Sequence, residues 1–105
     1  MQDVMSMVEK GEMLLVDVRE RGELAATGTA KGAIHVPVSL ITMKADPKAP
    51  NKDARFDLEK PVALYCASGG RSGMATQTLQ RMGYKAYNLG GFGAWVQSGG
   101  QVVRV

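Results

Sequence analysis

Short runs of apolar residues alternate along this chain with longer segments in which the apolar positions recur at the spacing of a helix. Residues 13–16 and 62–65 are continuous apolar runs, which are typical of strands buried on both faces of a parallel sheet. Residues 86–89 predict another strand, and residues 32–37 predict a short strand that stops at a proline. Residues 102–105 are either one more strand or a tail.

Helical spacing is found between these strands. Its clearest case is the segment 72–82, which ends before Gly83. The face predicted to be buried on that helix consists of Met74, Ala75, Thr78, Leu79 and Met82. Asp3 is the predicted N-cap of a first, shorter helix. The short helices or helical turns are predicted at residues 4–9, 20–26, 40–43 and 92–96.

This alternation of strands and helices predicts an α/β fold, with helices on both faces of a mostly parallel sheet. We expect residues 1–105 to form one domain, in which the polar, proline-containing segment 46–60 is a long surface connection. Ligands of such sheets bind at the carboxyl ends of the strands. Asp17 and Cys66 stand at the ends of two predicted strands, so we expect both at one edge, where the site lies.

Composition and charge exclude several classes of protein. With 45% apolar and 22% charged residues, the chain is expected to be globular rather than disordered. The net charge of +3 comes from scattered basic residues, whereas a nucleic-acid partner would require a clustered patch. No stretch of about 20 apolar residues is present, so no membrane-spanning helix is expected. A single cysteine and an N-terminus unlike a signal peptide favour a cytoplasmic protein.

The one cysteine begins a glycine-rich turn between a predicted strand and a predicted helix. Backbone amides of such a turn, and the positive end of the following helix, stabilise a thiolate, which is the nucleophilic form of cysteine. Arg71 adds a permanent positive charge and a bidentate fork for an anionic substrate. Ser72 can cap the helix and donate to the anion. We therefore predict Cys66 as the nucleophile. The predicted substrate-binding residues are Ala67, Ser68, Gly69, Gly70, Arg71 and Ser72.

Other polar residues are interpreted as structural. We expect Asp17 and Arg19 to support the turn, with Asp17 paired to Arg19 or Arg71 rather than transferring protons. His35 lies in an apolar strand and is interpreted as structural, so no Cys–His pair is predicted. No metal or cofactor site is predicted. Core packing is expected for three aromatic residues, one of which lines the mouth of the pocket: Tyr65, Phe92 and Trp95.

At this turn the chain resembles the rhodanese (sulfurtransferase) family in its single-domain form. The shared motif is a cysteine, four residues, an arginine and a hydroxyl residue, here running from Cys66 to Ser72. The sequence departs from the family at Thr29, where a histidine is usual, and at Leu24, where an aromatic residue often stands. Three further segments match in the same order along the chain: residues 15–19 with Glu23, residues 32–37 and residues 90–95.

The resemblance implies a rhodanese-like three-layer domain whose central sheet has about four to five strands. It also implies a persulfide cycle, in which Cys66 takes the outer sulfur of thiosulfate or a small persulfide and passes it to cyanide, a thiol or a partner protein. Because the chain has no second cysteine, the sulfur must leave to an outside acceptor. The expected partners are therefore a small sulfur-donor anion and an external acceptor, with no cofactor, nucleic acid or membrane.

Two other functions stay open on the sequence alone. Cysteine-dependent phosphatases and arsenate reductases also place a cysteine before an arginine at a helix N-terminus. Their signature has five residues between the two, whereas four lie between Cys66 and Arg71. A non-catalytic sulfur carrier or a redox sensor could use the same thiol.

Overall fold

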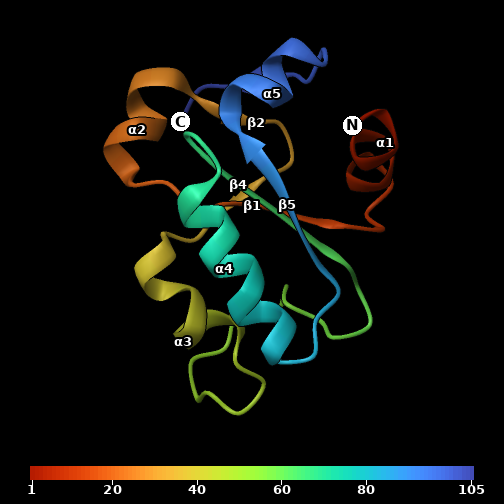
Figure 1. Cartoon of the computed structure of the whole chain (residues 1–105), viewed down its shortest axis with the longest axis vertical. Coiled ribbons are helices and arrows are strands. Elements are labelled where there is room, and N and C mark those ends of the chain that lie inside the picture. The colour runs from red at the N-terminus through yellow and green to blue at the C-terminus, as the bar shows by residue number, and fades with distance from the viewer.

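Four parallel strands form the centre of the computed structural model, which describes residues 1–105 (Figure 1). They are β1 (Leu14–Asp17), β3 (Ile34–His35), β4 (Val62–Cys66) and β5 (Ala86–Gly91). Their order across the sheet is β3-β1-β4-β5, and every neighbouring pair is parallel. The predicted parallel α/β architecture is therefore confirmed.

Helices cover both faces of this sheet, which gives the predicted three layers (Figure 1). The helices are α1 (Gln2–Glu9), α2 (Arg21–Thr27), a 3-10 turn η1 (Val38–Leu40), α3 (Ile41–Ala45), α4 (Gly70–Arg81) and α5 (Phe92–Gln97). Residues of α3 and α4 pack in one core cluster, and residues of α1 and α5 pack in the other. No helix is both long and apolar enough to cross a bilayer.

Side chains of β4 alternate between these two core clusters, because successive residues of a strand point to opposite faces. Val62, Leu64 and Cys66 join the cluster with α3 and α4. Ala63 and Tyr65 join the cluster with α1 and α5. Every residue of β1 and β4 is buried, as expected for inner strands of a parallel sheet. This alternation thus places the thiol of Cys66 on the α4 face of the sheet.

The predicted edge is confirmed, but its two polar residues face opposite ways. Asp17 pairs in register with Tyr65, so it lies beside the end of β4. Its carboxylate contacts the Tyr65 hydroxyl, on the α5 face of the sheet. Cys66 points to the α4 face. Both residues thus lie at the carboxyl edge, as predicted, but their side chains point to opposite faces of the sheet.

Helix α4 differs from its prediction in its start and in its buried face. It begins at Gly70 rather than at residue 72. Its buried residues are Ser72, Ala75, Thr76 and Leu79. Met74, predicted on that face, is 69% exposed, so this prediction was wrong. The reason is that two hydroxyl residues occupy core positions with their donors satisfied: Thr76 donates to the Ser72 carbonyl at 2.7 Å, and Ser72 donates to Asn88 at 2.7 Å.

A second, small sheet was only half predicted. It pairs β2 (Thr29–Ala30) antiparallel with β6 (Val102–Val103), so the final segment is a strand. Residues 46–60 form no helix or strand, as expected for a surface connection. Phe56 nevertheless anchors this segment: it is fully buried and packs edge-on against Tyr84, with ring centroids 6.1 Å apart.

The observed burial of α4 yields a direct test. We expect Leu79→Ala to lower the free energy of unfolding by about 2–5 kcal/mol, because it leaves a cavity where a fully buried side chain was packed. Met74→Ala, on the exposed side of the same helix, should change it by less than about 0.5 kcal/mol. Urea unfolding followed by circular dichroism measures both. Equal costs for the two variants would contradict the observed helix face.

Candidate active site

The sulfur of Cys66 lies at the focus of the loop that joins β4 to α4, here called the Cys66 loop (residues 66–72). Sγ accepts hydrogen bonds from the backbone N–H of Gly69 at 3.0 Å and of Ser72 at 3.4 Å. The hydroxyl of Ser72 lies 3.3 Å from the same sulfur. The loop therefore directs three donors at one atom, which is the arrangement of an anion-binding nest.

Two glycines allow the loop to close around the sulfur. Gly69 is the N-cap of α4 and has a φ of +99°, a left-handed conformation that side chains rarely adopt. A Cβ at Gly91 would lie 2.5 Å from the Ala67 carbonyl oxygen, so the loop and the end of β5 pack backbone against backbone. Ser72 was predicted both to cap the helix and to donate to the anion. The cap is Gly69, and the Ser72 hydroxyl faces the sulfur.

These contacts set the charge of the thiol. Burial of Cys66 raises its pKa, but hydrogen bonds from the Ser72 hydroxyl and amide, and from the amides of Ser68 and Gly69, outweigh that effect. The result is a pKa lowered from 9.0 to about 7. The positive end of the 12-residue helix α4 lies at the same place and favours the anion. The thiolate of Cys66 is thus favoured at neutral pH relative to that of an ordinary cysteine.

Asn88, on the neighbouring strand β5, forms hydrogen bonds with two residues of the Cys66 loop. Its Nδ2 donates to the Gly69 carbonyl at 3.0 Å, and its Oδ1 accepts from the Ser72 hydroxyl at 2.7 Å and from the Gly90 amide at 2.9 Å. Because the Ser72 hydroxyl has a single proton, Asn88 and the sulfur compete for it. The sequence alone predicts no role for Asn88. A polar amide inside the predicted strand 86–89 was the available signal.

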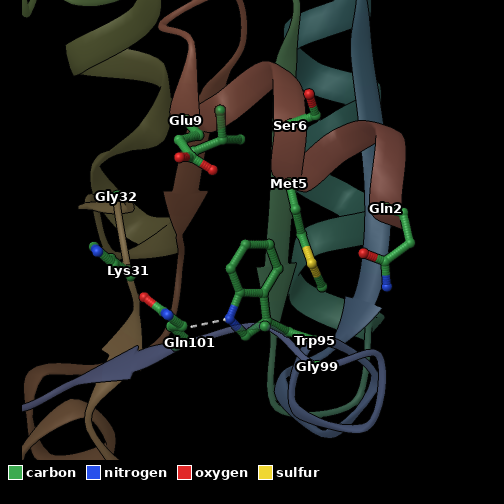
Figure 2. Close-up of a pocket in the computed structure, with 11 residues that line it drawn as sticks. Gln2, Met5, Ser6, Glu9, Lys31, Gly32, Trp95, Gly99 and Gln101 are labelled. Carbon is green, nitrogen blue, oxygen red and sulfur yellow. Dashed lines mark hydrogen bonds between the residues drawn. The ribbon is translucent and has the colours of Figure 1, made fainter.

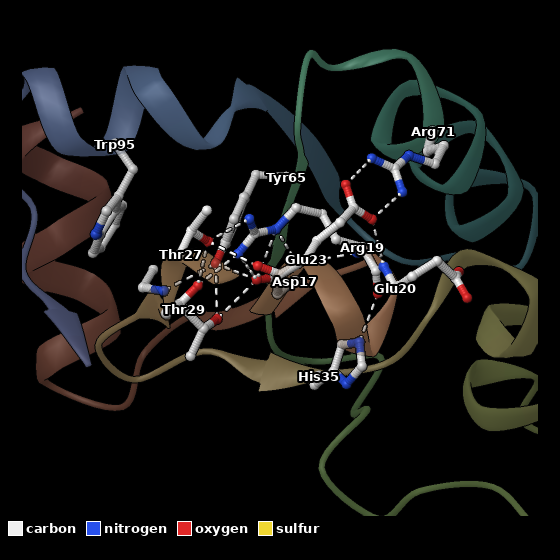
Figure 3. Close-up of polar contacts among 12 residues, drawn as sticks. Asp17, Arg19, Glu20, Glu23, Thr27, Thr29, His35, Tyr65, Arg71 and Trp95 are labelled. Carbon is white, nitrogen blue, oxygen red and sulfur yellow. Dashed lines mark hydrogen bonds and ion pairs between the residues drawn. The ribbon is translucent and has the colours of Figure 1, made fainter. Parts of the chain in front are cut away.

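Arg71, which is predicted to bind an anionic substrate, is paired with the carboxylate of Glu23 in this structure. Its Nη1 and Nη2 donate to the two carboxylate oxygens of Glu23, at 2.7 Å and 2.8 Å (Figure 3). Both side chains are about one third exposed, at 34% and 33%. The hydrogen bonds from Arg71 and from the Glu20 amide lower the pKa of Glu23 from 4.5 to about 2. Arg71 therefore carries its charge beside the thiol, but shares it with a carboxylate.

Asp17 and Arg19 form a buried ion pair behind the loop, which is one of the two pairings predicted for Asp17 (Figure 3). Asp17 accepts from the Arg19 guanidinium at 2.8 Å, from the Tyr65 hydroxyl at 2.6 Å and from the Thr29 hydroxyl at 2.8 Å. The Arg19 guanidinium also lies over the Phe92 ring, 4.4 Å from its centroid. Thr29, a departure from the family pattern, thus completes this buried network.

His35 belongs to the same structural layer. Its Nε2 lies 2.6 Å from the Arg19 carbonyl oxygen (Figure 3). No hydrogen bond joins His35 to Cys66.

Burial raises the pKa of Tyr65 to about 12, so its phenol stays protonated and donates to Asp17. These residues position the carboxyl ends of β1 and β4 and make no contact with the sulfur.

A hollow of the surface lies away from the Cys66 loop. It measures about 600 Å³ and lies between α1, the turn at Lys31–Gly32 and the end of α5 (Figure 2). Trp95 lines it and donates to the Gln101 carbonyl at 2.8 Å. No residue of the Cys66 loop belongs to this hollow. That one of Tyr65, Phe92 and Trp95 lines the mouth of the candidate site stays a prediction. The chain also brings together no group of three or more metal-ligating side chains.

Comparison with known proteins agrees with this fold. Residues 1–98 match the family model of the rhodanese-like domain, and the chain belongs to this family. It is 30% identical over 103 residues to human thiosulfate:glutathione sulfurtransferase, an alignment that covers 90% of this chain and 89% of that protein.

Two further proteins broaden the comparison. An uncharacterized Bacillus subtilis protein, YqhL, is 41% identical over 83 residues, which are 77% of this chain. The matched part is 59% of the length of YqhL. A solved Rhodopseudomonas palustris protein of unknown function, described as a possible tyrosine phosphatase, superposes with a TM-score of 0.84 at 32% identity. That superposition covers 97% of this chain and 80% of the other.

The two neighbouring glycines of the loop provide a matched test of the sulfur cradle. Gly69→Ala should slow alkylation of Cys66 at pH 7 several-fold, because strain at a φ of +99° moves the Gly69 amide and raises the thiol pKa above about 7. Gly70→Ala should change neither the alkylation rate nor the thiol pKa, since a Cβ there has no atom within 4 Å. The pH dependence of iodoacetamide alkylation measures both pKa values. If Gly69→Ala titrates like the unaltered chain, the Gly69 amide does not stabilise the anion.

The chain contains an exposed copy of its buried ion pair, which isolates the effect of burial. Asp53 and Arg55 have the same sequence spacing and the same bidentate contact as Asp17 and Arg19, yet the Arg55 side chain is 57% exposed. We expect Asp17→Asn to lower the free energy of unfolding by about 3–5 kcal/mol, since it leaves Arg19 buried and unpaired. Asp53→Asn should lower it by at most about 1 kcal/mol. Similar losses in thermal or urea unfolding would show that burial of the first pair is unimportant.

Proposed function

We propose that this chain is a sulfurtransferase and that Cys66 is its nucleophile. One observation carries the proposal: the Gly69 amide, the Ser72 amide and the Ser72 hydroxyl all lie within 3.4 Å of the same sulfur. A thiol with a pKa near 7 combines a high thiolate fraction with good nucleophilicity. Membership of the rhodanese-like family and relatives described as sulfurtransferases support the same conclusion.

The proposed reaction has two displacements. In the first, the Cys66 thiolate attacks the outer sulfur of the donor, and the donor's S–S bond breaks with its electron pair on the leaving group. With thiosulfate the leaving group is sulfite, and the enzyme becomes Cys66–S–S⁻. In the second, an acceptor nucleophile attacks the outer sulfur and the Cys66 thiolate is restored. Each half needs a negative sulfur to be stabilised, which is what convergent amides supply.

Residues 67–72 form the proposed substrate-binding site, since they surround the sulfur and their rim is open. Ala67, Ser68 and Gly70 are exposed, whereas Cys66 itself is buried at the base of the loop. The exposed side chains are small and uncharged. A donor or acceptor that presents a single sulfur atom fits this rim, and a bulky group beside that sulfur would not reach the base.

The name of one relative suggests the classes of sulfur donor and acceptor. The human relative is named thiosulfate:glutathione sulfurtransferase. We propose thiosulfate or a small persulfide as the donor, and a low-molecular-weight thiol, a partner protein or, as an assay reagent, cyanide as the acceptor. No second cysteine exists in residues 1–105 to take the sulfur. A cytoplasmic location stays a prediction from the sequence.

Intact mass spectrometry tests the proposal. After incubation with thiosulfate and removal of excess donor, we expect the protein to gain the mass of one sulfur atom, and to lose it when cyanide or a thiol is added. Cys66→Ser should gain nothing, because a serine hydroxyl is not ionised at neutral pH. Met74→Ala, on the exposed side of α4, serves as the folded control that keeps the thiol and the loop.

One structural relative supports a second candidate. The Rhodopseudomonas palustris protein is described as a possible tyrosine phosphatase. The four-residue spacing between Cys66 and Arg71 makes a tighter loop than the five-residue phosphatase motif, which favours a single sulfur over a tetrahedral oxyanion. Hydrolysis of an aryl phosphate faster than sulfur transfer from thiosulfate would reverse this preference.

A further inference from the structure

We propose that Glu23 sets the substrate class of this site by occupying the Arg71 guanidinium, so that donors with one negative charge are used in preference to dianionic thiosulfate. The inference rests on the proposed sulfurtransferase function and adds to it a residue that determines specificity. It comes from an unexpected contact: the side chain that should receive an anionic donor already holds an anion.

The contact has the geometry of substrate recognition. Arg71 presents Nη1 and Nη2 to the two oxygens of Glu23 at 2.7 Å and 2.8 Å, which is how an arginine binds a planar or tetrahedral oxyanion. Glu23 is itself held in place, because its Oε2 accepts from the Glu20 amide at 2.8 Å in a capping box at the start of α2. The capping box therefore holds the Glu23 carboxylate next to the Arg71 guanidinium.

The charges around the sulfur point the same way. Arg19, at the end of β1, is buried and paired with Asp17, so its charge is neutralised there. Glu20 and Arg21, beside Glu23, are both exposed and of opposite sign. No arginine at the Cys66 loop is thus without a carboxylate, and the thiolate itself is negative. A dianion approaching the sulfur must displace Glu23 to gain a bidentate contact with Arg71.

Two donors that differ in one charge separate the effect of charge from that of sulfur chemistry. Thiosulfate reacts as Cys66–S⁻ + S–SO₃²⁻ → Cys66–S–S⁻ + SO₃²⁻. The methanethiosulfonate anion reacts as Cys66–S⁻ + CH₃SO₂–S⁻ → Cys66–S–S⁻ + CH₃SO₂⁻. In both, the sulfur–sulfur bond of the donor breaks and its electron pair leaves on the oxidised sulfur. In a ping-pong cycle, kcat/KM for the donor reports this half-reaction alone, whatever acceptor is used.

Glu23→Gln is the informative variant, because glutamine keeps the shape and can keep the capping box while removing the charge. We expect the ratio of kcat/KM for thiosulfate to kcat/KM for methanethiosulfonate to rise about tenfold, a size limited by solvent screening of a partly exposed pair. Glu20→Gln is the matched control: it removes a charge from the same helix turn but has no contact with Arg71, so the ratio should stay the same. An unchanged or lowered ratio in Glu23→Gln would overturn the proposal.

A binding measurement tests the same inference without catalysis. Sulfate is the probe, in protein whose nucleophile is replaced by Cys66→Ser, and its Kd is measured by titration of amide signals in NMR spectra. Adding Glu23→Gln should tighten sulfate binding about tenfold, by removal of the competing carboxylate. If neither donor transfers sulfur in any variant, the proposed function fails, while the sulfate titration still decides the role of Glu23. A Kd that does not change would refute that role.

Discussion

A buried sulfur that is held negative by backbone amides is the interaction on which the rest of this structure depends. Removing a thiolate from water is costly, and burial alone would raise the pKa of Cys66. Hydrogen bonds from Ser72, Ser68 and Gly69 reverse the sign of that effect. Because those donors are mostly peptide groups, the chemistry of the site is set by the path of the backbone rather than by a catalytic acid or base.

The surrounding fold can be understood as support for that path. Strand β4 delivers the sulfur to the α4 face, and the left-handed Gly69 turns the chain so that α4 begins over it. Asn88 holds the loop from β5, through the Gly69 carbonyl and the Ser72 hydroxyl. On the opposite face, the Asp17–Arg19 pair fixes the neighbouring strand ends. The Cys66 loop is therefore supported by hydrogen bonds from β5, and the neighbouring strand ends by a buried ion pair.

The sequence predicts the parts of this site that are local, and fails where the contact is distant. The turn from Cys66 to Ser72 and the Asp17–Arg19 pairing involve residues close in the chain, and both are found. Glu23 lies 48 residues from Arg71, and Asn88 lies 16 residues from Ser72, so no spacing pattern joins them. The apolar pattern predicts a buried Met74, but that side chain is exposed. Ser72 and Thr76 are buried on that helix instead, because their hydroxyls form hydrogen bonds inside the core.

The central claim can be tested directly by an NMR titration of protein labelled with ¹³C at the Cys66 Cβ and with ¹⁵N throughout. The account predicts that the Cβ shift titrates with a midpoint near pH 7, and that the amide protons of Gly69 and Ser72 move downfield with the same midpoint as the thiolate forms. A Cβ midpoint near 9, or amide signals of Gly69 and Ser72 that do not follow the thiol, would contradict it.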